Sequence, residues 1–265
     1  MSDAAPRVPH HTAALSQGAT IPLLGFGTWQ IKGEDAVRAT AAALDSGYRH
    51  LDTATVYGNE GEVGRALAES GVAREDVFVT TKCPPMRAGQ ELATLRESLE
   101  LLQTDHVDLW LIHWPGEGSV NTEMWRAFVE ARDAGLAKEI GVSNFDPALI
   151  DEITEATGVR PAVNQIEWSP LLFDAEVLAA HLERGVVLEG YSALRGGTLD
   201  HPVIVEIAER LGRTPAQVII RWHLQHGVIV IPKSVHAERI RSNADVDGFD
   251  LSDDDMAALD ALGGA

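Results

Sequence analysis

The sequence is short of cysteine, of positive charge and of long apolar runs, and each shortage excludes a class of protein. Its one cysteine, Cys83, cannot form a disulfide within the chain, so we expect a reducing cytoplasm. Against 40 aspartates and glutamates there are 21 lysines and arginines, and a formal net charge of −19 argues against nucleic acid or an anionic membrane as a partner. The longest apolar runs, such as Val228–Ile231, are too short to span a bilayer, and the first residues lack a signal-peptide layout.

No linker or low-complexity tract divides the 265 residues, so we expect one domain, 1–265, with a flexible start over 1–11. Short apolar runs alternate with amphipathic stretches along almost the whole chain. Eight of the runs are typical of buried parallel strands: Leu23–Gly27, His50–Thr53, Val77–Lys82, Val107–His113, Glu139–Val142, Ala162–Gln165, Val186–Tyr191 and Val228–Pro232. Eight strand–helix units in a chain of this length favour an α/β fold of the (β/α)8 barrel type over an open doubly wound sheet.

The segments outside the repeating units are predicted to add to the barrel. Gly18 lies between two short apolar pieces and predicts an N-terminal β-hairpin across the bottom of the barrel. Residues 235–243 and 252–262 predict two extra helices after the last strand. A chain of this size buries a large core without help from disulfides or metals, and we predict no metal site.

Polar and ionisable residues recur at the C-terminal ends of the predicted strands, which is where the active site of a barrel lies. In chain order they are Asp52 and Tyr57, Lys82, His113, Ser143 and Asn144, Gln165, Tyr191 and Lys233. One such residue is weak evidence. Because the same placement recurs on successive strands, it predicts a cleft with convergent polar groups.

Three of these residues, Asp52, Tyr57 and Lys82, suit a proton donor. A free tyrosine has a pKa of about 10. A lysine cation lowers that pKa by stabilising the phenolate, and a carboxylate can hold the lysine in place. A neutral His113 could then hydrogen-bond a substrate carbonyl and orient it. Taken singly, each residue has a structural explanation, such as an ion pair or a buried histidine, but their joint placement favours catalysis.

Sequence blocks in fixed order carry a specific resemblance. The blocks are 47–60 (GYRHLDTATVYGNE), 80–82 (TTK), 107–115 (VDLWLIHWP), 140–145 (IGVSNF), 164–167 (NQIE), 191–194 (YSAL) and 231–235 (IPKSV), continuing to Arg239 and Asn243. They resemble the signature blocks of the aldo-keto reductase family over about residues 15–262, and look most like its bacterial 2,5-diketogluconate reductase type. The resemblance implies a (β/α)8 barrel that binds NADPH extended across the strand ends, which fits the absence of a GxGxxG motif.

The resemblance also implies a role for each strand-end residue. Hydride passes from the nicotinamide to a carbonyl carbon, and Tyr57 protonates the oxygen. Lys82 and Asp52 tune Tyr57, and His113 orients the substrate. The residues that would hold the cofactor are Thr28, Ser143, Asn144, Gln165, Tyr191, Ser192, Leu194, Lys233, Ser234, Val235, Arg239 and Asn243.

Within that cofactor set, Lys233, Ser234 and Arg239 would bind the 2′-phosphate of the adenosine. Two cations there favour NADPH over NADH, because an ammonium and a guanidinium fork suit a phosphate. They also supply the local positive charge that an acidic chain needs to bind an anion. Trp29 and Trp114 are the expected aromatic walls of an open substrate pocket, although each could instead belong to the core.

Three functions stay open at this point. The first is NADPH-dependent reduction of small aldehydes, α-dicarbonyls or keto sugars by a monomer. The second is an NADPH-binding sensor or regulatory subunit on the same fold with little turnover. The third is a phosphosugar isomerase or aldolase with Lys82 as a Schiff-base lysine. The complete set of four central residues favours the first. Departures from the family pattern, among them Trp168, Ala193 and Arg195, leave the substrate open.

Overall fold

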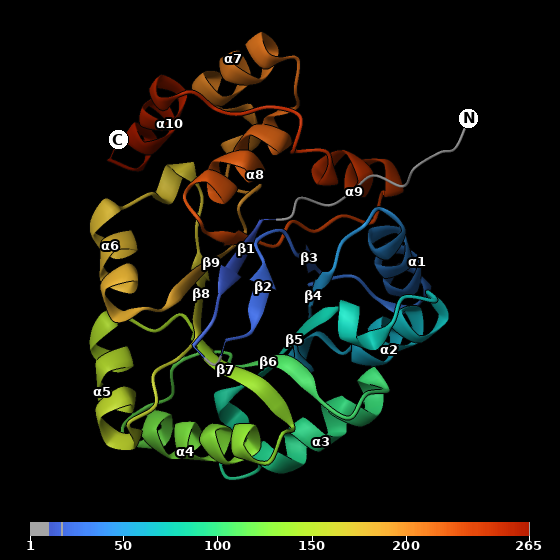
Figure 1. Ribbon diagram of the computed structural model, residues 1–265, viewed down its shortest axis with the longest axis vertical. Helices are drawn as coiled ribbons and strands as arrows, with labels where there is room; N and C mark the ends of the chain where they lie inside the picture. The colour runs from blue at the N-terminus through green and yellow to red at the C-terminus, as the bar shows by residue number, and fades with distance from the viewer. Residues whose placement is uncertain (1–10, 17, 265) are drawn as a thin grey trace.

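A ring of helices surrounds a central parallel sheet in the computed structural model (Figure 1), which describes residues 11–16 and 18–264. The prediction of a flexible start over residues 1–11 falls outside the described residues except at His11, whose carbonyl oxygen accepts from Leu23 N at 2.9 Å. The parallel strands are β3 (Phe26–Gly27), β4 (His50–Asp52), β5 (Phe78–Cys83), β6 (Val107–Ile112), β7 (Ala137–Ser143), β8 (Val163–Glu167), β9 (Val187–Tyr191) and β10 (Ile229–Val230). Each overlaps one of the eight predicted strands.

The sheet closes into a barrel. Strands pair in chain order from β3 to β10, all of them parallel. At the seam between the first and last strands, Leu24 forms a parallel bridge with Val230. Gly25 N donates to Val230 O at 2.9 Å, and Gly27 N donates to Pro232 O at 3.2 Å. The (β/α)8 prediction is confirmed.

Helices cover the outside of the barrel because each carries one apolar stripe (Figure 1). They are α1 (Gly33–Asp45), α2 (Glu60–Glu69), α3 (Glu91–Leu102), α4 (Val120–Asp133), α5 (Pro147–Thr157), α6 (Ala175–Arg184), α7 (Pro202–Leu211), α8 (Pro215–Gln225), α9 (Ala237–Ala244) and α10 (Asp253–Asp260). Short 3-10 helices are η1 (Thr55–Tyr57), η2 (Arg74–Asp76), η3 (Pro85–Arg87), η4 (Pro170–Leu172), η5 (Thr198–Asp200) and η6 (Ala261–Gly264). On α4, for example, Phe128 stacks on Trp110 of β6 with ring centroids 3.6 Å apart. Helices α9 and α10 are the two predicted extra helices.

A hairpin of β1 (Thr12–Ala14) and β2 (Thr20–Pro22) lies across the centre of the ring in Figure 1. It leads directly into β3, so it covers the end of the barrel where the strands begin. Ser16 Oγ donates to Glu139 Oε2 in the first half of β7 at 3.0 Å. The predicted hairpin is thus the floor of the barrel, and the C-terminal strand ends, where the sequence places the polar residues, face the other way.

The closing seam can be tested at Gly27. A Cβ at this position would lie 2.7 Å from the carbonyl oxygen of Ile231. Because backbone cannot yield as a flexible side chain can, we expect Gly27→Ala to lower the free energy of unfolding in urea by about 1–3 kcal/mol. Gly61→Ala is the matched control, since its Cβ would meet only Leu101 Cδ2 at 3.7 Å. There the better helix former should leave stability unchanged or raise it by at most about 1 kcal/mol. Equal stability of the Gly27→Ala and wild-type chains would contradict the tight seam.

Candidate active site

A buried ion pair stands at the centre of the strand ends. Lys82, near the end of β5, is fully buried, and Asp52, the last residue of β4, is 1% exposed. Lys82 Nζ donates to Oδ1 and Oδ2 of Asp52, both at 2.7 Å, and to Thr53 O at 2.9 Å. Burial is the largest single influence on Lys82 and works to lower its pKa, but the charge and hydrogen bond of Asp52, together with Tyr57 and Glu189, outweigh burial and raise the pKa. The ammonium therefore keeps its proton inside the barrel.

Tyr57 and His113 complete the predicted group of four. Tyr57 lies at the end of η1, and Lys82 Nζ donates to its hydroxyl oxygen at 3.4 Å. The His113 ring meets the Tyr57 ring edge to face, with centroids 5.7 Å apart. Burial, and then the positive charge of Lys82, lower the pKa of His113 to about 3. The imidazole is therefore neutral, as the sequence predicts.

One sequence expectation about Tyr57 is wrong for the free chain. We expected Lys82 to bring the pKa of the phenol below its ordinary value. Burial instead raises the pKa of Tyr57 by more than the Lys82 cation lowers it, and the negative charge of Asp52 adds to the rise. Lys82 makes Tyr57 a stronger acid than burial alone would leave it, but not stronger than a tyrosine in water.

A chain of hydrogen bonds links the ends of β7, β8 and β9 to this ion pair. Tyr191 OH donates to Asn144 Oδ1 at 2.8 Å, and Asn144 Nδ2 donates to Ser143 Oγ at 2.9 Å. Ser143 Oγ donates to Gln165 O at 2.8 Å. Gln165 Nε2 then donates to Asp52 Oδ2 at 2.9 Å. Residues that the sequence assigned to the cofactor and to catalysis thus belong to one network.

Backbone strain marks two of these strand ends. Asn144 follows β7 with a φ of 63°, and Ser192 follows β9 with a φ of 58°. Left-handed backbone costs a residue with a side chain about 1 kcal/mol or more, and it persists where the surrounding structure holds it. Thr28 is held as firmly, because its N–H and its hydroxyl both donate to Asp52 O, at 3.1 and 2.9 Å. The strand ends are a rigid surface.

The residues predicted for the far end of the cofactor lie on and before α9. Lys233 and Arg239 are exposed, and neither forms a hydrogen bond or ion pair with any residue the structure describes. Ser234 is buried, and its hydroxyl accepts from His236 N at 3.0 Å. Val235 is exposed, and Asn243 is buried on α9.

The two predicted aromatic walls stand clear of the core. Trp29 is 43% exposed and Trp114 is 50% exposed, so the alternative that they belong to the core is wrong. The guanidinium of Arg195 lies 5.0 Å from the centre of the Trp29 ring. This contact joins the loop after β3 to the loop after β9, where Leu194 packs half-buried against the core.

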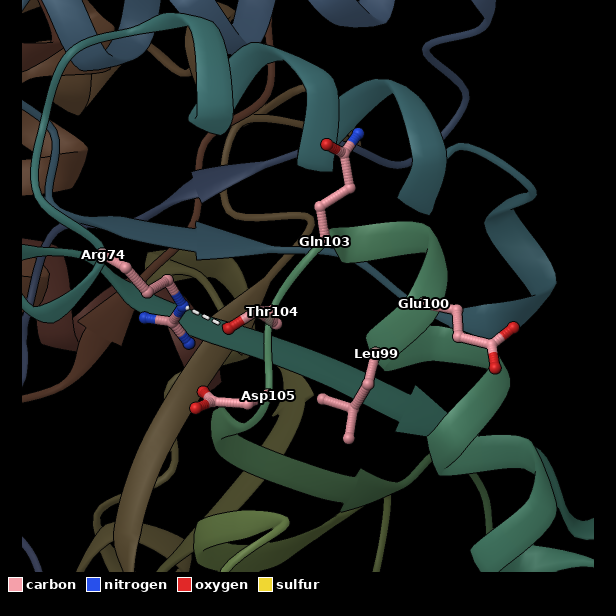
Figure 2. Close-up of a pocket in the computed structure, with 6 residues that line it drawn as sticks. All are labelled: Arg74, Leu99, Glu100, Gln103, Thr104 and Asp105. Atoms are coloured by element: carbon pink, nitrogen blue, oxygen red, sulfur yellow. Dashed lines mark hydrogen bonds between the residues drawn. The ribbon is translucent and has the colours of Figure 1, made fainter.

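A separate surface depression lies away from this site. Figure 2 shows it where β5 and β6 begin, at the floor end of the barrel, lined by Arg74, Leu99, Glu100, Gln103, Thr104 and Asp105. Arg74 donates there to Thr104 Oγ1 at 2.9 Å and pairs with Asp108 at 2.8 Å. Its guanidinium is thus committed to the fold rather than to a ligand.

Sequence reasoning missed two buried residues beside the ion pair, His50 and Glu189. Each is fully buried, and His50 Nε2 lies 3.9 Å from Glu189 Oε1. His50 precedes Asp52 by two residues on β4, so both side chains point to the same face of the strand. A signal existed, because Glu189 is the one charged residue of the apolar run Val186–Tyr191.

Several known proteins are similar to this chain over most of its length. The family model described as "Aldo/keto reductase family" matches residues 23–263. An aldo-keto reductase of Mycolicibacterium smegmatis is 49% identical over 252 residues, 94% of this chain and 92% of that protein. A glyoxal reductase of Bacillus subtilis is 42% identical, over 95% and 92% of the two chains. The crystal structure of a Bombyx mori aldo-keto reductase in complex with NADP superposes with a TM-score of 0.90 at 32% identity, covering 97% and 94%.

Over 11–16 and 18–264, no helix is long and apolar enough to cross a membrane. Within the same residues, no group of three or more histidine, cysteine, aspartate or glutamate side chains is placed to hold a metal ion.

The buried ion pair leads to a test by a double-mutant cycle. Lys82→Met leaves the carboxylate of Asp52 buried without its cation, so we expect the free energy of unfolding to fall by about 3–5 kcal/mol. Adding Asp52→Asn removes the stranded charge, and the double variant should be more stable than Lys82→Met alone. Urea unfolding at neutral pH measures the stability of wild type, of each single variant and of the double variant. Losses that simply add would mean that the two charges do not depend on each other.

Proposed function

The chain belongs to the aldo/keto reductase family and is an oxidoreductase, and from that premise we propose that it reduces small carbonyl compounds with NADPH, with Tyr57 as the proton donor. The observation that carries the proposal is the contact of the Tyr57 hydroxyl with Lys82, whose charge Asp52 fixes. No other tyrosine hydroxyl among the described residues contacts a lysine.

The donor set of the chain fits NADP(H). Lys233 and Arg239 offer an ammonium and a guanidinium, which suit a 2′-phosphate. Ser143, Asn144 and Gln165 present amide and hydroxyl groups at the strand ends, and Tyr191 adds an aromatic face. The bound cofactor supplies a hydride for the carbonyl carbon. The NADP found in the Bombyx mori relative supports this assignment.

Proton delivery follows from the geometry around Tyr57. The phenol gives its proton to the carbonyl oxygen as negative charge develops there. Lys82 then stabilises the phenolate, and Asp52 keeps the ammonium pointed at it. The neutral His113, packed against the Tyr57 ring, orients the carbonyl by a hydrogen bond. The raised pKa of Tyr57 in the free chain ensures that the acid is protonated before substrate binds.

Three substrate classes suit the site: small aldehydes, α-dicarbonyls and keto sugars. Trp29 and Trp114 are both exposed, which suits them as walls of an open pocket for compact, polar carbonyl compounds. The glyoxal reductase among the relatives supports the α-dicarbonyls. The resemblance to 2,5-diketogluconate reductases supports the keto sugars.

Tyr57→Phe tests the proton donor. We expect kcat for carbonyl reduction to fall by about 10²–10⁴-fold, because the acid is lost, while the Kd for NADPH stays the same. The absorbance of NADPH, followed with a panel of carbonyl compounds, measures kcat, and a fluorescence titration measures the Kd. Tyr48→Phe is the control, since this buried tyrosine donates to Ile240 O at 3.2 Å, away from the site. Retained turnover in Tyr57→Phe would remove Tyr57 from the mechanism. NADPH binding without turnover by the wild-type chain would favour the sensor function.

Arg239→Ala tests the cofactor assignment. Loss of a charge-assisted hydrogen bond should raise the Kd for NADPH by about 10- to 100-fold and leave the Kd for NADH nearly unchanged. Arg241→Ala is the matched control, because Arg241 is exposed on the same helix two residues further on and so faces another way. Equal losses for NADPH and NADH would show that Arg239 does not bind the 2′-phosphate.

A further inference from the structure

Glu189 is a carboxyl group with no visible partner in the interior of the barrel. It is fully buried in β9, and neither of its carboxyl oxygens accepts a hydrogen bond from any described residue. The amide of Gln165 is near enough to lower the pKa of Glu189 somewhat, but the hydrogen bond that its Nε2 forms is to Asp52 Oδ2, at 2.9 Å. A buried carboxylate without donors would be severely unfavourable.

The nearest imidazole cannot serve as a donor to Glu189. His50 Nδ1 lies 3.3 Å from the carbonyl oxygen of Pro22, which only accepts, so this nitrogen carries the ring proton. Burial lowers the pKa of His50 to about 4, so the ring is neutral and Nε2 has no proton. Nε2 accepts from the hydroxyl of Thr80 at 3.1 Å. It therefore offers neither a charge nor a hydrogen to Glu189 across 3.9 Å.

The lysine is equally committed. Among the described residues, Lys82 Nζ donates only to Asp52, Thr53 and Tyr57. The titratable groups that face Glu189 are thus His50 and Asp52 on β4, Lys82 on β5 and Tyr57 on η1. Gln165 on β8 also faces it and is uncharged. On the other side of β9, the residue of β10 that pairs with Glu189 is the apolar Ile229. One cation among these groups is already matched by one carboxylate.

We propose that Glu189 holds a proton in the working enzyme and that, as a neutral carboxyl beside the Asp52–Lys82 pair, it is a positioning residue that keeps Tyr57 acidic. The inference rests on the proposed role of Tyr57 as proton donor. Burial raises the pKa of Glu189 to about 8, and the negative charge of Asp52 adds to the rise. The proton is thus present near neutral pH and lost under mildly alkaline conditions.

The charge count explains why this proton matters. With Glu189 neutral, Asp52 and Lys82 sum to zero, and the phenolate of Tyr57 forms against no excess negative charge. With Glu189 ionised, the group carries a net charge of −1. That charge raises the pKa of Tyr57 further. Ionisation of Glu189 therefore makes Tyr57 a weaker acid.

The first test is the pH profile of kcat/KM for carbonyl reduction. Wild type should show a partial fall of roughly threefold near the pKa of Glu189, the size expected if Tyr57 shifts by about one pKa unit and half of that shift appears in the transition state. Glu189→Gln mimics the neutral carboxyl and should lack this step. Glu60→Gln is the matched control and should keep the step. Glu60, on α2, is also a buried carboxyl with a raised pKa, but it has a donor, because Thr81 Oγ1 donates to it at 2.6 Å. A step that persists in Glu189→Gln overturns the inference, whereas an active Tyr57→Phe would overturn the proposed function.

The second test follows stability and needs no turnover. A carboxyl whose pKa is raised on folding stabilises the native state fully below its ordinary value of 4.5, and this stabilisation is lost as the pH rises toward about 8. Over that window the unfolding constant of wild type should grow relative to that of Glu189→Gln by up to about tenfold for each pH unit. A ratio that does not change with pH overturns the inference.

A third measurement covers the case in which Glu189→Gln does not fold. Infrared difference spectra of the Glu60→Gln protein, recorded between about pH 6 and about pH 9, isolate the carboxyl of Glu189. A protonated-carboxyl band that disappears on raising the pH supports the proposal. Absence of that band at the lower pH overturns it.

Discussion

An ammonium and a carboxylate lie 2.7 Å apart inside the closed barrel, and the other polar groups of the site take their places from this pair. Taking either ion out of water alone costs several kcal/mol, so each is stable there only while the other is present. Asp52 also accepts from Gln165 through its carboxylate and from Thr28 through its carbonyl. Tyr57 meets the pair from the other side. The groups proposed to face the cofactor and the group proposed to donate the proton are therefore positioned by one interaction.

The barrel makes this interaction possible because it fixes β4 and β5 side by side. Asp52 pairs with Thr80 in the register of these strands, and Lys82 follows Thr80 by two residues on the same face. The closed seam at Gly27 keeps the register from slipping, since a closed sheet has no free edge. The hairpin closes the floor, so the ion pair meets a ligand only at the strand ends.

The sequence predicts the strands, the hairpin and the four central residues because each leaves a local mark. A charged or polar residue at the end of an apolar run, such as Lys82 or His113, is visible without coordinates. The acidity of Tyr57 is not, because its sign depends on how far burial outweighs a neighbouring cation. Glu189 was missed for a related reason: its importance arises from the absence of donors around it, and an absence in space leaves no pattern in the chain.

Trp29 and Trp114 are exposed, whereas the ion pair is buried, and the two kinds of position differ in how well they tolerate substitution. Substitutions at exposed loop positions usually alter stability by about 0.5 kcal/mol or less, whereas the ion pair and the left-handed strand ends tolerate little. For protein engineering, the exposed loop positions such as Trp29 and Trp114 are the place to diversify a library, and the strand ends are the place to leave alone.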